Sequence, residues 1–166
     1  HRIENPELYH MDSLNVDLGQ YHDTGKVDVT AMNPPYGGST DAIVKTRFKS
    51  EYRSSETADL FMVLIMERLE KNGRAAVVVP DGFLFGNDTA KINIKKRLLT
   101  QFNLHTIIRL PGSVFAPYTN IATNVLFFNN EVAKDSAEGF STKETWFYRM
   151  DMPKGYVHFN KSNPMK

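Results

Sequence analysis

The sequence has 166 residues, of which 41% are hydrophobic and 23% are charged, as in an ordinary globular domain. It contains no cysteine, which excludes disulfide scaffolds, zinc ribbons, iron–sulfur sites and cysteine nucleophiles. The formal net charge is only +1, and the longest apolar run, Leu60–Met66, is too short to span a membrane.

The first third of the chain is predicted to contain one buried strand and a long connection. Leu8–Met11 favours a short strand, and Val27–Met32 has the apolar character of a strand that enters a core. Residues 37–57 are mostly polar and show no clear period. A connection of this length inside a compact domain is either functional or disordered, so we expect a long polar loop there.

A helix is predicted over Asp59–Asn72. Its apolar residues recur at helical spacing, which gives one broad buried face. Glu67 and Lys71 stand four residues apart, as in a helical ion pair, and Gly73 follows as the expected helix stop.

The second half alternates strands and helices. Ala75–Val79 is continuously apolar, as in a strand covered on both faces, and a helix is expected after Asp88. His105–Leu110 and Thr123–Phe128 are joined by a loop with glycine and proline, which favours an antiparallel pair. Thr145–Met150 favours a further short strand. This order is typical of a doubly wound α/β layer.

The feature that points to function is Asn33-Pro34-Pro35-Tyr36, directly after the strand Val27–Met32. Asn-Pro alone is a common loop opener. This tetrapeptide, however, lies where a buried strand meets its loop, which is where open α/β sheets bind ligands. The position therefore favours a functional role over a simple turn.

Asn33-Pro34-Pro35-Tyr36 resembles the catalytic signature of S-adenosylmethionine-dependent amino methyltransferases, chiefly the N6-adenine DNA enzymes. The surrounding segments narrow the resemblance to the modification (M) subunit of type I restriction–modification systems. The likeness runs from about Asp12 to Tyr148 and is carried by Val27–Gly38, Asp59–Phe61, Gly73–Gly82, Ile108–Pro111, Val114–Pro117 and Thr123–Phe128. It implies an α/β, partial Rossmann-like methyltransferase fold with three αβα layers and the antiparallel strand pair at the sheet edge.

The resemblance implies methyl transfer from S-adenosylmethionine to adenine N6 in DNA. Adenine N6 is a poor nucleophile because its lone pair is delocalised, and attack on the methyl group places positive charge on the nitrogen. The Asn33 side-chain oxygen and the Pro34 carbonyl are expected to accept from the N6 hydrogens and stabilise that charge. Pro34 and Pro35 stiffen the backbone, and Tyr36 offers a ring on which a flipped-out base can stack.

Two further residues take roles from the same resemblance. Asp12 aligns with the acidic position that contacts the adenine ring of the cofactor, although an Asp before a Ser is also typical of a turn. Phe115 lies in the loop that can close on the other face of the target base, and a buried packing role is an equal alternative. The five histidines show no ligand spacing, so no metal site is predicted.

The sequence contains two groups of basic residues. The first lies within the long polar segment and favours either a DNA contact or a solvated surface. It comprises Lys45, Arg47, Lys49 and Arg53. The second group, Lys95, Lys96 and Arg97, is interpreted as the solvated face of a helix.

The chain departs from the family in one large respect. Nothing between His1 and Asp28 resembles the glycine-rich loop that holds the cofactor, and the acidic residue expected at the ribose is missing too. We therefore expect residues 1–150 to be the C-terminal part of a methyltransferase catalytic domain with an incomplete cofactor site, followed by a polar tail over 151–166. The isolated chain is expected to be inactive.

The resemblance also implies partners and a location. DNA and the specificity and restriction subunits are the expected partners, with no membrane contact, in the cytoplasm of a bacterium or archaeon. Two other functions stay open: a protein-glutamine or RNA amino methyltransferase, and a catalytically inert module for folding or subunit contact.

Overall fold

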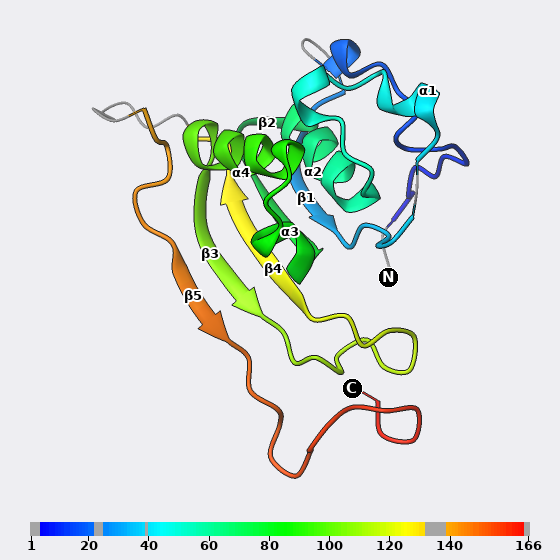
Figure 1. Ribbon diagram of the computed structural model, residues 1–166, viewed down its shortest axis with the longest axis vertical. Helices are drawn as coiled ribbons and strands as arrows, with labels where there is room; N and C mark the ends of the chain where they lie inside the picture. Colours follow the sequence, from blue (N-terminus) through cyan, green and yellow to red (C-terminus); the bar gives the residue numbers. More distant parts are fainter. Residues whose placement is uncertain (1–3, 22–24, 39, 132–138, 165–166) are drawn as a thin grey trace.

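Five strands form one sheet in the computed structural model, which describes residues 4–21, 25–38, 40–131 and 139–164 (Figure 1). Their spatial order is β1-β2-β4-β3-β5. The strands are β1 (Val27–Met32), β2 (Leu69–Pro80), β3 (Asn103–Arg109), β4 (Thr123–Asn129) and β5 (Trp146–Arg149). The predicted strands at these places are confirmed, whereas Leu8–Met11 forms no strand.

The antiparallel strand β4 lies in the middle of the sheet. It pairs antiparallel with both β2 and β3, while β1 pairs parallel with β2 and β5 pairs parallel with β3. The expected antiparallel pair of β3 and β4 exists, but the prediction that it forms the sheet edge is wrong. The reason is that Trp146–Arg149 adds a further strand beyond β3.

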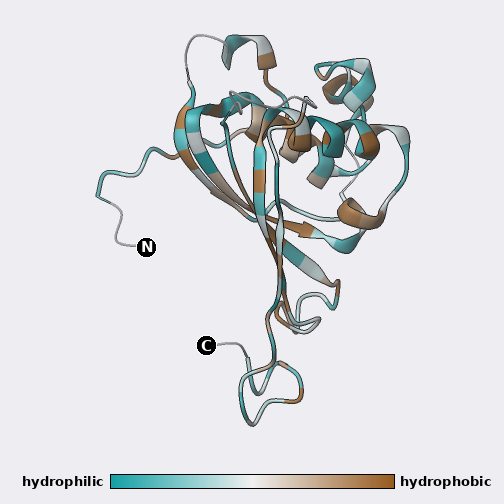
Figure 2. Cartoon of the chain, turned by 90° about the vertical axis from the view of Figure 1, so that its left-hand side faces the viewer, coloured by the Kyte–Doolittle hydropathy of each residue, from teal (hydrophilic) through white to brown (hydrophobic). Residues whose placement is uncertain are grey.

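Three helices cover one face of the sheet: α2 (Thr57–Arg68), α3 (Asp81–Phe85) and α4 (Thr89–Gln101) (Figures 1 and 2). Residues paired across strands point to the same face, so Val77, Leu126 and Ile107 form one buried row beneath these helices. Asp88 caps α4 by accepting from the Lys91 backbone N–H at 3.1 Å, and the helix expected after Asp88 is confirmed.

The opposite face of the sheet carries no helix in the described part of the chain (Figure 2). Ala31, Ala76 and Phe127 form a row on that face, and all three are half-buried or exposed. The α/β class is confirmed, but the described residues form two layers where three were expected. The row is still apolar because alternate residues of a central strand carry apolar side chains to both faces.

Helix α2 ends earlier than predicted. It stops at Arg68, and Leu69 already pairs with Val27 of β1, so Lys71 lies in a strand and forms no helical pair with Glu67. Glu67 instead binds Arg97 of α4 at 2.7 Å. Sheet pairing with β1 therefore overrides the helical spacing in this stretch.

Gly73 is required by close packing and does not stop the helix. A Cβ at this position would lie 2.8 Å from the Glu70 carbonyl oxygen and 3.0 Å from the Asp28 carbonyl oxygen. The preceding residue, Asn72, has a φ of +63°, and it lies at the irregularity between the Val27–Leu69 pair and the regular pairing that resumes at Val29 and Arg74.

The segment from 37 to 57 and the C-terminal tail both have more structure than their polarity indicates. The segment contains α1 (Ala42–Lys45) and a short 3₁₀ turn, η2 (Ser50–Tyr52), and it buries Phe48. A second 3₁₀ turn, η1 (Leu18–Tyr21), precedes β1. In the tail, Phe159 is only 3% exposed.

Candidate active site

The Asn33–Tyr36 motif begins at the carboxyl end of β1. The strand ends there because Pro34 and Pro35 have no N–H to donate to a sheet ladder. Asn33 is exposed, Pro34 is buried and Tyr36 is half-buried. The motif thus presents the asparagine side chain outward from a backbone that is anchored at the first proline.

Two hydrogen bonds hold the motif. The Tyr36 hydroxyl donates to the Asn33 side-chain oxygen, and the Thr57 hydroxyl, from the first turn of α2, donates to the Pro35 carbonyl at 2.8 Å. Burial raises the pKa of Tyr36, so its phenol remains protonated and can donate. The predicted acceptor, Asn33 Oδ1, is therefore already hydrogen-bonded within the motif.

An apolar hollow of about 430 Å³ lies beside Tyr36. Pro80 and Phe83 from the end of β2 and α3 line it, together with Ile121 from the loop that precedes β4. The loops after β1 and β3 thus border a common space at this end of the sheet. Phe115, in the same β3–β4 loop, is half-buried, and its predicted contact with the base stays a prediction.

Asp12 forms a turn of its own. Its carboxylate accepts from the Leu14 N–H at 2.9 Å and its carbonyl accepts from the Asn15 N–H at 3.0 Å. This is the turn geometry that an Asp before a Ser favours. The predicted cofactor contact of Asp12 is not tested by these bonds and stays a prediction.

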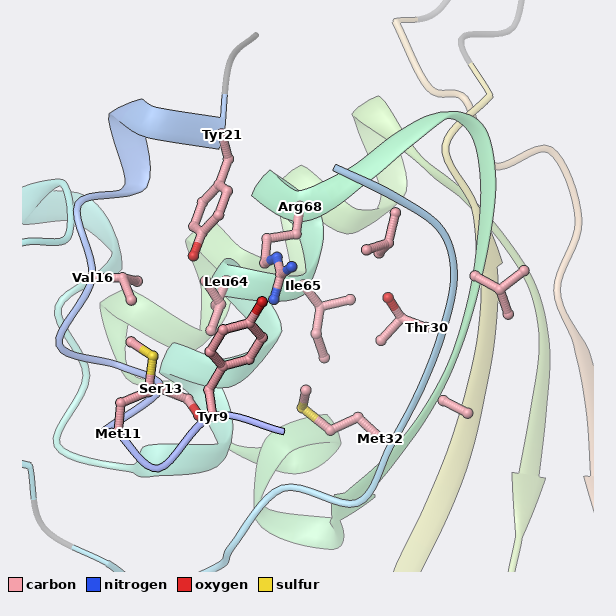
Figure 3. A pocket seen from close by; sticks show the side chains of 13 residues that line it. Tyr9, Met11, Ser13, Val16, Tyr21, Thr30, Met32, Leu64, Ile65 and Arg68 are labelled. Carbon is pink, nitrogen blue, oxygen red and sulfur yellow. The ribbon is translucent and has the colours of Figure 1, made fainter. Parts of the chain in front are cut away.

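The residues on either side of Asp12 line a second hollow, of about 410 Å³, along β1 (Figure 3). Met11 and Ser13 approach it from the N-terminal segment, and Met32, the residue before Asn33, approaches it from β1. Arg68 of α2 also borders it, with its guanidinium 5.0 Å from the centre of the Tyr21 ring. The hollow therefore connects the neighbourhood of Asp12 with the residue next to the motif.

These residues fit one side of a site for a nucleoside that carries a positively charged sulfonium group with aliphatic substituents. Methionine side chains and a tyrosine ring supply apolar wall, and Asp12 stands between two of the lining residues, Met11 and Ser13. The expectation that the cofactor site is incomplete in this chain stays a prediction.

A cluster at the same end of the sheet was not predicted as a site. Arg109, at the end of β3, binds the Asp81 carboxylate with two hydrogen bonds of 2.8 Å, and the Asn124 amide donates to the same carboxylate at 2.8 Å. Each residue belongs to a different motif of the family resemblance. Membership of these motifs marked each residue separately, but it did not show that the three side chains meet.

The cluster closes the base of the β3–β4 loop. The Asp81 N–H donates to the Ala122 carbonyl at 2.9 Å, and the Leu110 N–H donates to the Thr123 carbonyl at 3.0 Å. Burial tends to raise the pKa of Asp81, but the hydrogen bonds and charge of Arg109, with the Asn124 amide, outweigh it and lower that pKa. Asp81 is therefore ionised at neutral pH.

A buried ion-pair network supports α2 just behind the motif. Asp59 is 1% exposed, accepts from the Ser54 hydroxyl at 2.5 Å and binds the Lys91 ammonium at 2.9 Å. Lys91 also reaches Asp88 at 3.0 Å. Burial would lower the pKa of Lys91, but the two carboxylates outweigh it and raise that pKa. The first turn of α2 is thereby tied to the first turn of α4.

The basic residues are placed in different ways. Arg53 donates to the carbonyls of Phe48 and Thr46, so it holds the 37–57 segment together. Arg47 and Lys49 are exposed and Lys45 is half-buried. A DNA contact by this group stays a prediction.

The prediction that residues 95–97 are only a solvated helix face is wrong for two of the three. Lys95 donates to the carbonyls of Leu84 and Gly86 at 2.9 and 2.6 Å. Arg97 is partly buried in its pair with Glu67, because α2 packs beside α4. Lys96 alone is exposed.

Within the described residues, no group of three or more His, Asp or Glu side chains could hold a metal ion. No helix in that part of the chain is long and apolar enough to cross a membrane.

Comparison with known proteins matches the whole chain, residues 1–166, to the family described as N-6 DNA Methylase. The chain is 46% identical over 167 residues to the EcoEI methylase subunit of a type I restriction enzyme from Escherichia coli. It is 36% identical over 142 residues to the EcoKI methylase subunit from E. coli K12. These alignments cover 100% and 84% of this chain but only 32% and 25% of the relatives, so the chain spans between a quarter and a third of their length.

Solved structures agree with these matches. The modification subunit assigned to a type I restriction enzyme of Vibrio vulnificus superposes with a TM-score of 0.83 at 41% identity, over 94% of this chain and 32% of that one. The EcoKI M protein superposes with a TM-score of 0.73 at 34% identity, over 93% and 30%. The resemblance to type I modification subunits is thereby confirmed.

Proposed function

This chain belongs to the N-6 DNA methylase family, and on that premise we propose that it carries the target-base part of an enzyme that methylates adenine N6 in DNA. The observation that carries the proposal is the position of Asn33 and Pro34, at the carboxyl end of a sheet strand. There the asparagine amide is exposed and the backbone is fixed by two prolines. We infer that the complete enzyme contains further polypeptide, as its relatives do.

The motif supplies two hydrogen-bond acceptors for the target amine. Asn33 Oδ1 accepts from one N6 hydrogen, in place of the Tyr36 hydroxyl that occupies it in this structure, and the Pro34 carbonyl accepts from the other. As the nitrogen attacks the methyl group it gains positive charge, which both oxygens stabilise. The acceptors are held in place before the reaction, so little reorganisation is needed.

Tyr36 contributes an aromatic surface for the extruded base. A base that leaves the duplex loses its stacking, and a ring in the pocket returns about 1–3 kcal/mol of that loss. Burial of Tyr36 on one side and the apolar hollow on the other support this use of its ring.

S-adenosylmethionine is the methyl donor of this proposal, and it supplies an electrophilic methyl group when bound. In this chain Asp12 would hold its adenine, and the wall formed by Met11, Ser13 and Met32 would cover it. The remaining contacts would come from polypeptide outside this chain, so the isolated chain is proposed to be inactive.

We further propose the partners and the location that this function requires. DNA is the substrate, and the exposed Arg47 and Lys49 in the 37–57 segment are available for its phosphates. Specificity and restriction subunits are the proposed protein partners, since the relatives are methylase subunits of type I restriction enzymes. The compartment is the cytoplasm of a prokaryotic cell.

Replacing Asn33 by alanine in the complete methylase tests the proposal. Loss of one acceptor that acts in the transition state should slow methylation by about 10²–10³-fold, by analogy with removal of an oxyanion-hole donor. Tritiated methyl transfer to a duplex with the recognition sequence measures the rate. Asn129→Ala, at the opposite end of the sheet, is the matched control and should leave the rate unchanged.

Methylation by Asn33→Ala within tenfold of the wild-type rate would contradict the assignment of Asn33. Transfer to a glutamine peptide or to RNA, with duplex DNA unmodified, would replace the substrate class.

A further inference from the structure

We infer that Thr57 is a positioning residue for the Asn33–Tyr36 motif, and that it acts through the Pro35 carbonyl. The inference rests on the proposed function, because it concerns how the two acceptors of the target amine are held. Thr57 lies 22 residues beyond Pro35 in sequence and at the first position of α2.

The motif needs an anchor from outside because its own backbone cannot supply one. Pro34 and Pro35 have no N–H, so neither residue can bind a neighbouring segment as a backbone donor. Their φ angles are fixed by the rings, and the freedom that remains is rotation about ψ, which sets the directions of the two carbonyls. A donor that binds the Pro35 carbonyl removes part of that freedom.

Thr57 supplies this donor. Its hydroxyl donates to the Pro35 carbonyl at 2.8 Å, and the bond is partly buried because Thr57 is only 8% exposed while Pro35 is exposed. The Pro35 ring is bonded to the peptide group that contains the Pro34 carbonyl. Fixing Pro35 therefore restrains the second acceptor on one side and the Tyr36 ring on the other.

The methyl group of Thr57 contacts the same loop. A Cβ added to Gly38 would lie 3.1 Å from the Thr57 Cγ2 atom, so the glycine allows the loop to lie directly against this side chain. Thr57 thus contacts the motif segment with both branches of its side chain, the hydroxyl at Pro35 and the methyl at Gly38.

Helix α2 gives Thr57 a rigid base. Two residues along, the buried Asp59 binds Ser54 and Lys91, and Lys91 belongs to α4. Most of α2 is buried in the core. A hydroxyl on such a helix holds its direction, which a hydroxyl on a loop would not.

The test is Thr57→Val in the complete methylase, because valine keeps the shape and removes the donor. Under single-turnover conditions we expect methylation to slow by roughly tenfold, as small misplacement of catalytic groups does. The KM for DNA and the Kd for S-adenosylmethionine should stay within twofold. Thr57→Ser, which keeps the hydroxyl, should restore most of the rate.

Thr89→Val is the matched control, since Thr89 is the first residue of α4 and is exposed. It should leave the rate unchanged. If Thr57→Val fails to fold, Thr57→Ala compared with Thr57→Ser makes the same test, because alanine lacks the donor that serine keeps.

The inference is overturned if Thr57→Val methylates at the wild-type rate, or if Thr57→Ser is as slow as Thr57→Ala. Asn33→Ala, measured beside these variants, separates the two proposals. If Asn33→Ala is fully active, the proposed function fails. If Asn33→Ala is inactive while Thr57→Val is normal, only the positioning role fails.

Discussion

The loop after β1 and the loop after β3 leave the same end of the sheet, but they are held there by different forces. The first, which carries Asn33–Tyr36, is short and proline-stiffened and is fixed by a neutral hydroxyl–carbonyl bond from Thr57. The second, residues 110–122, is longer and is closed at its base by the charged pair of Asp81 and Arg109.

The two loops also differ in how far they are held. In the second loop, the Ser113 hydroxyl accepts from the Phe159 N–H at 2.8 Å, yet Tyr118 is 92% exposed. The first loop contacts α2 within a few residues of the motif. A neutral anchor close to the reacting groups suits a fixed geometry, whereas a charged anchor at the base leaves the tip of a loop free to meet a large substrate.

The largest difference should appear when one aromatic ring is removed from each loop. Tyr36→Ala should weaken base capture by about 1–3 kcal/mol, the value of one stacking contact, whereas Phe115→Ala should cost less. Tyr36→Phe keeps the ring and should be nearly silent. Fluorescence of 2-aminopurine at the target position, in the complete methylase, measures capture. A larger loss for Phe115→Ala would assign the stacking role to the second loop.

A smaller effect is expected when the charged anchor is broken. Arg109→Met removes both hydrogen bonds to Asp81 and should lower the free energy of unfolding by about 1–2 kcal/mol, since the pair is partly exposed to solvent. Thermal unfolding measures it. A double-mutant cycle with Asp81→Asn isolates the pair. A coupling energy near zero would show that the second loop is not held by this charge pair.

The smallest effect concerns pH, and it separates the two anchors directly. Asp81 has a pKa lowered from its ordinary 3.8, so its contribution to stability is present above that value and is lost as the pH falls through the lowered pKa. The difference in unfolding free energy between wild type and Asp81→Asn should therefore be constant near neutral pH and begin to narrow once the pH falls below 3.8. The Thr57 bond carries no charge. The free energy of unfolding of Thr57→Val should therefore differ from that of wild type by the same amount at every pH.

The strands could be predicted because their signal is local. Val27–Met32 and Thr123–Asn129 are apolar runs bounded by turn residues, and both form strands. The end of α2 could not be predicted, since Glu67 and Lys71 have helical spacing and only the pairing of Leu69 with Val27 decides against it. The position of β5 beyond β3 could not be predicted either, because it depends on pairing between strands that are far apart in sequence.

The candidate site likewise has parts that follow from local sequence and parts that depend on tertiary contacts. The motif Asn33–Tyr36 could be identified from the sequence because its residues are contiguous. The partners of the motif could not be, since a single threonine hydroxyl 22 residues away has no pattern that distinguishes it from any other. Asp81, Arg109 and Asn124 lay within three separate motifs, but nothing in the spacing of those motifs says that their side chains meet.

The central place of β4 has a consequence for synthesis. Strands β2 and β3 are made first, and they end up on either side of a strand that the ribosome delivers after both. Until residue 129 has emerged, each of them has an edge without its final partner. The pairing of β4 with β3 then closes only the 110–122 loop, whereas its pairing with β2 spans a longer stretch of sequence and is expected to be the slower of the two.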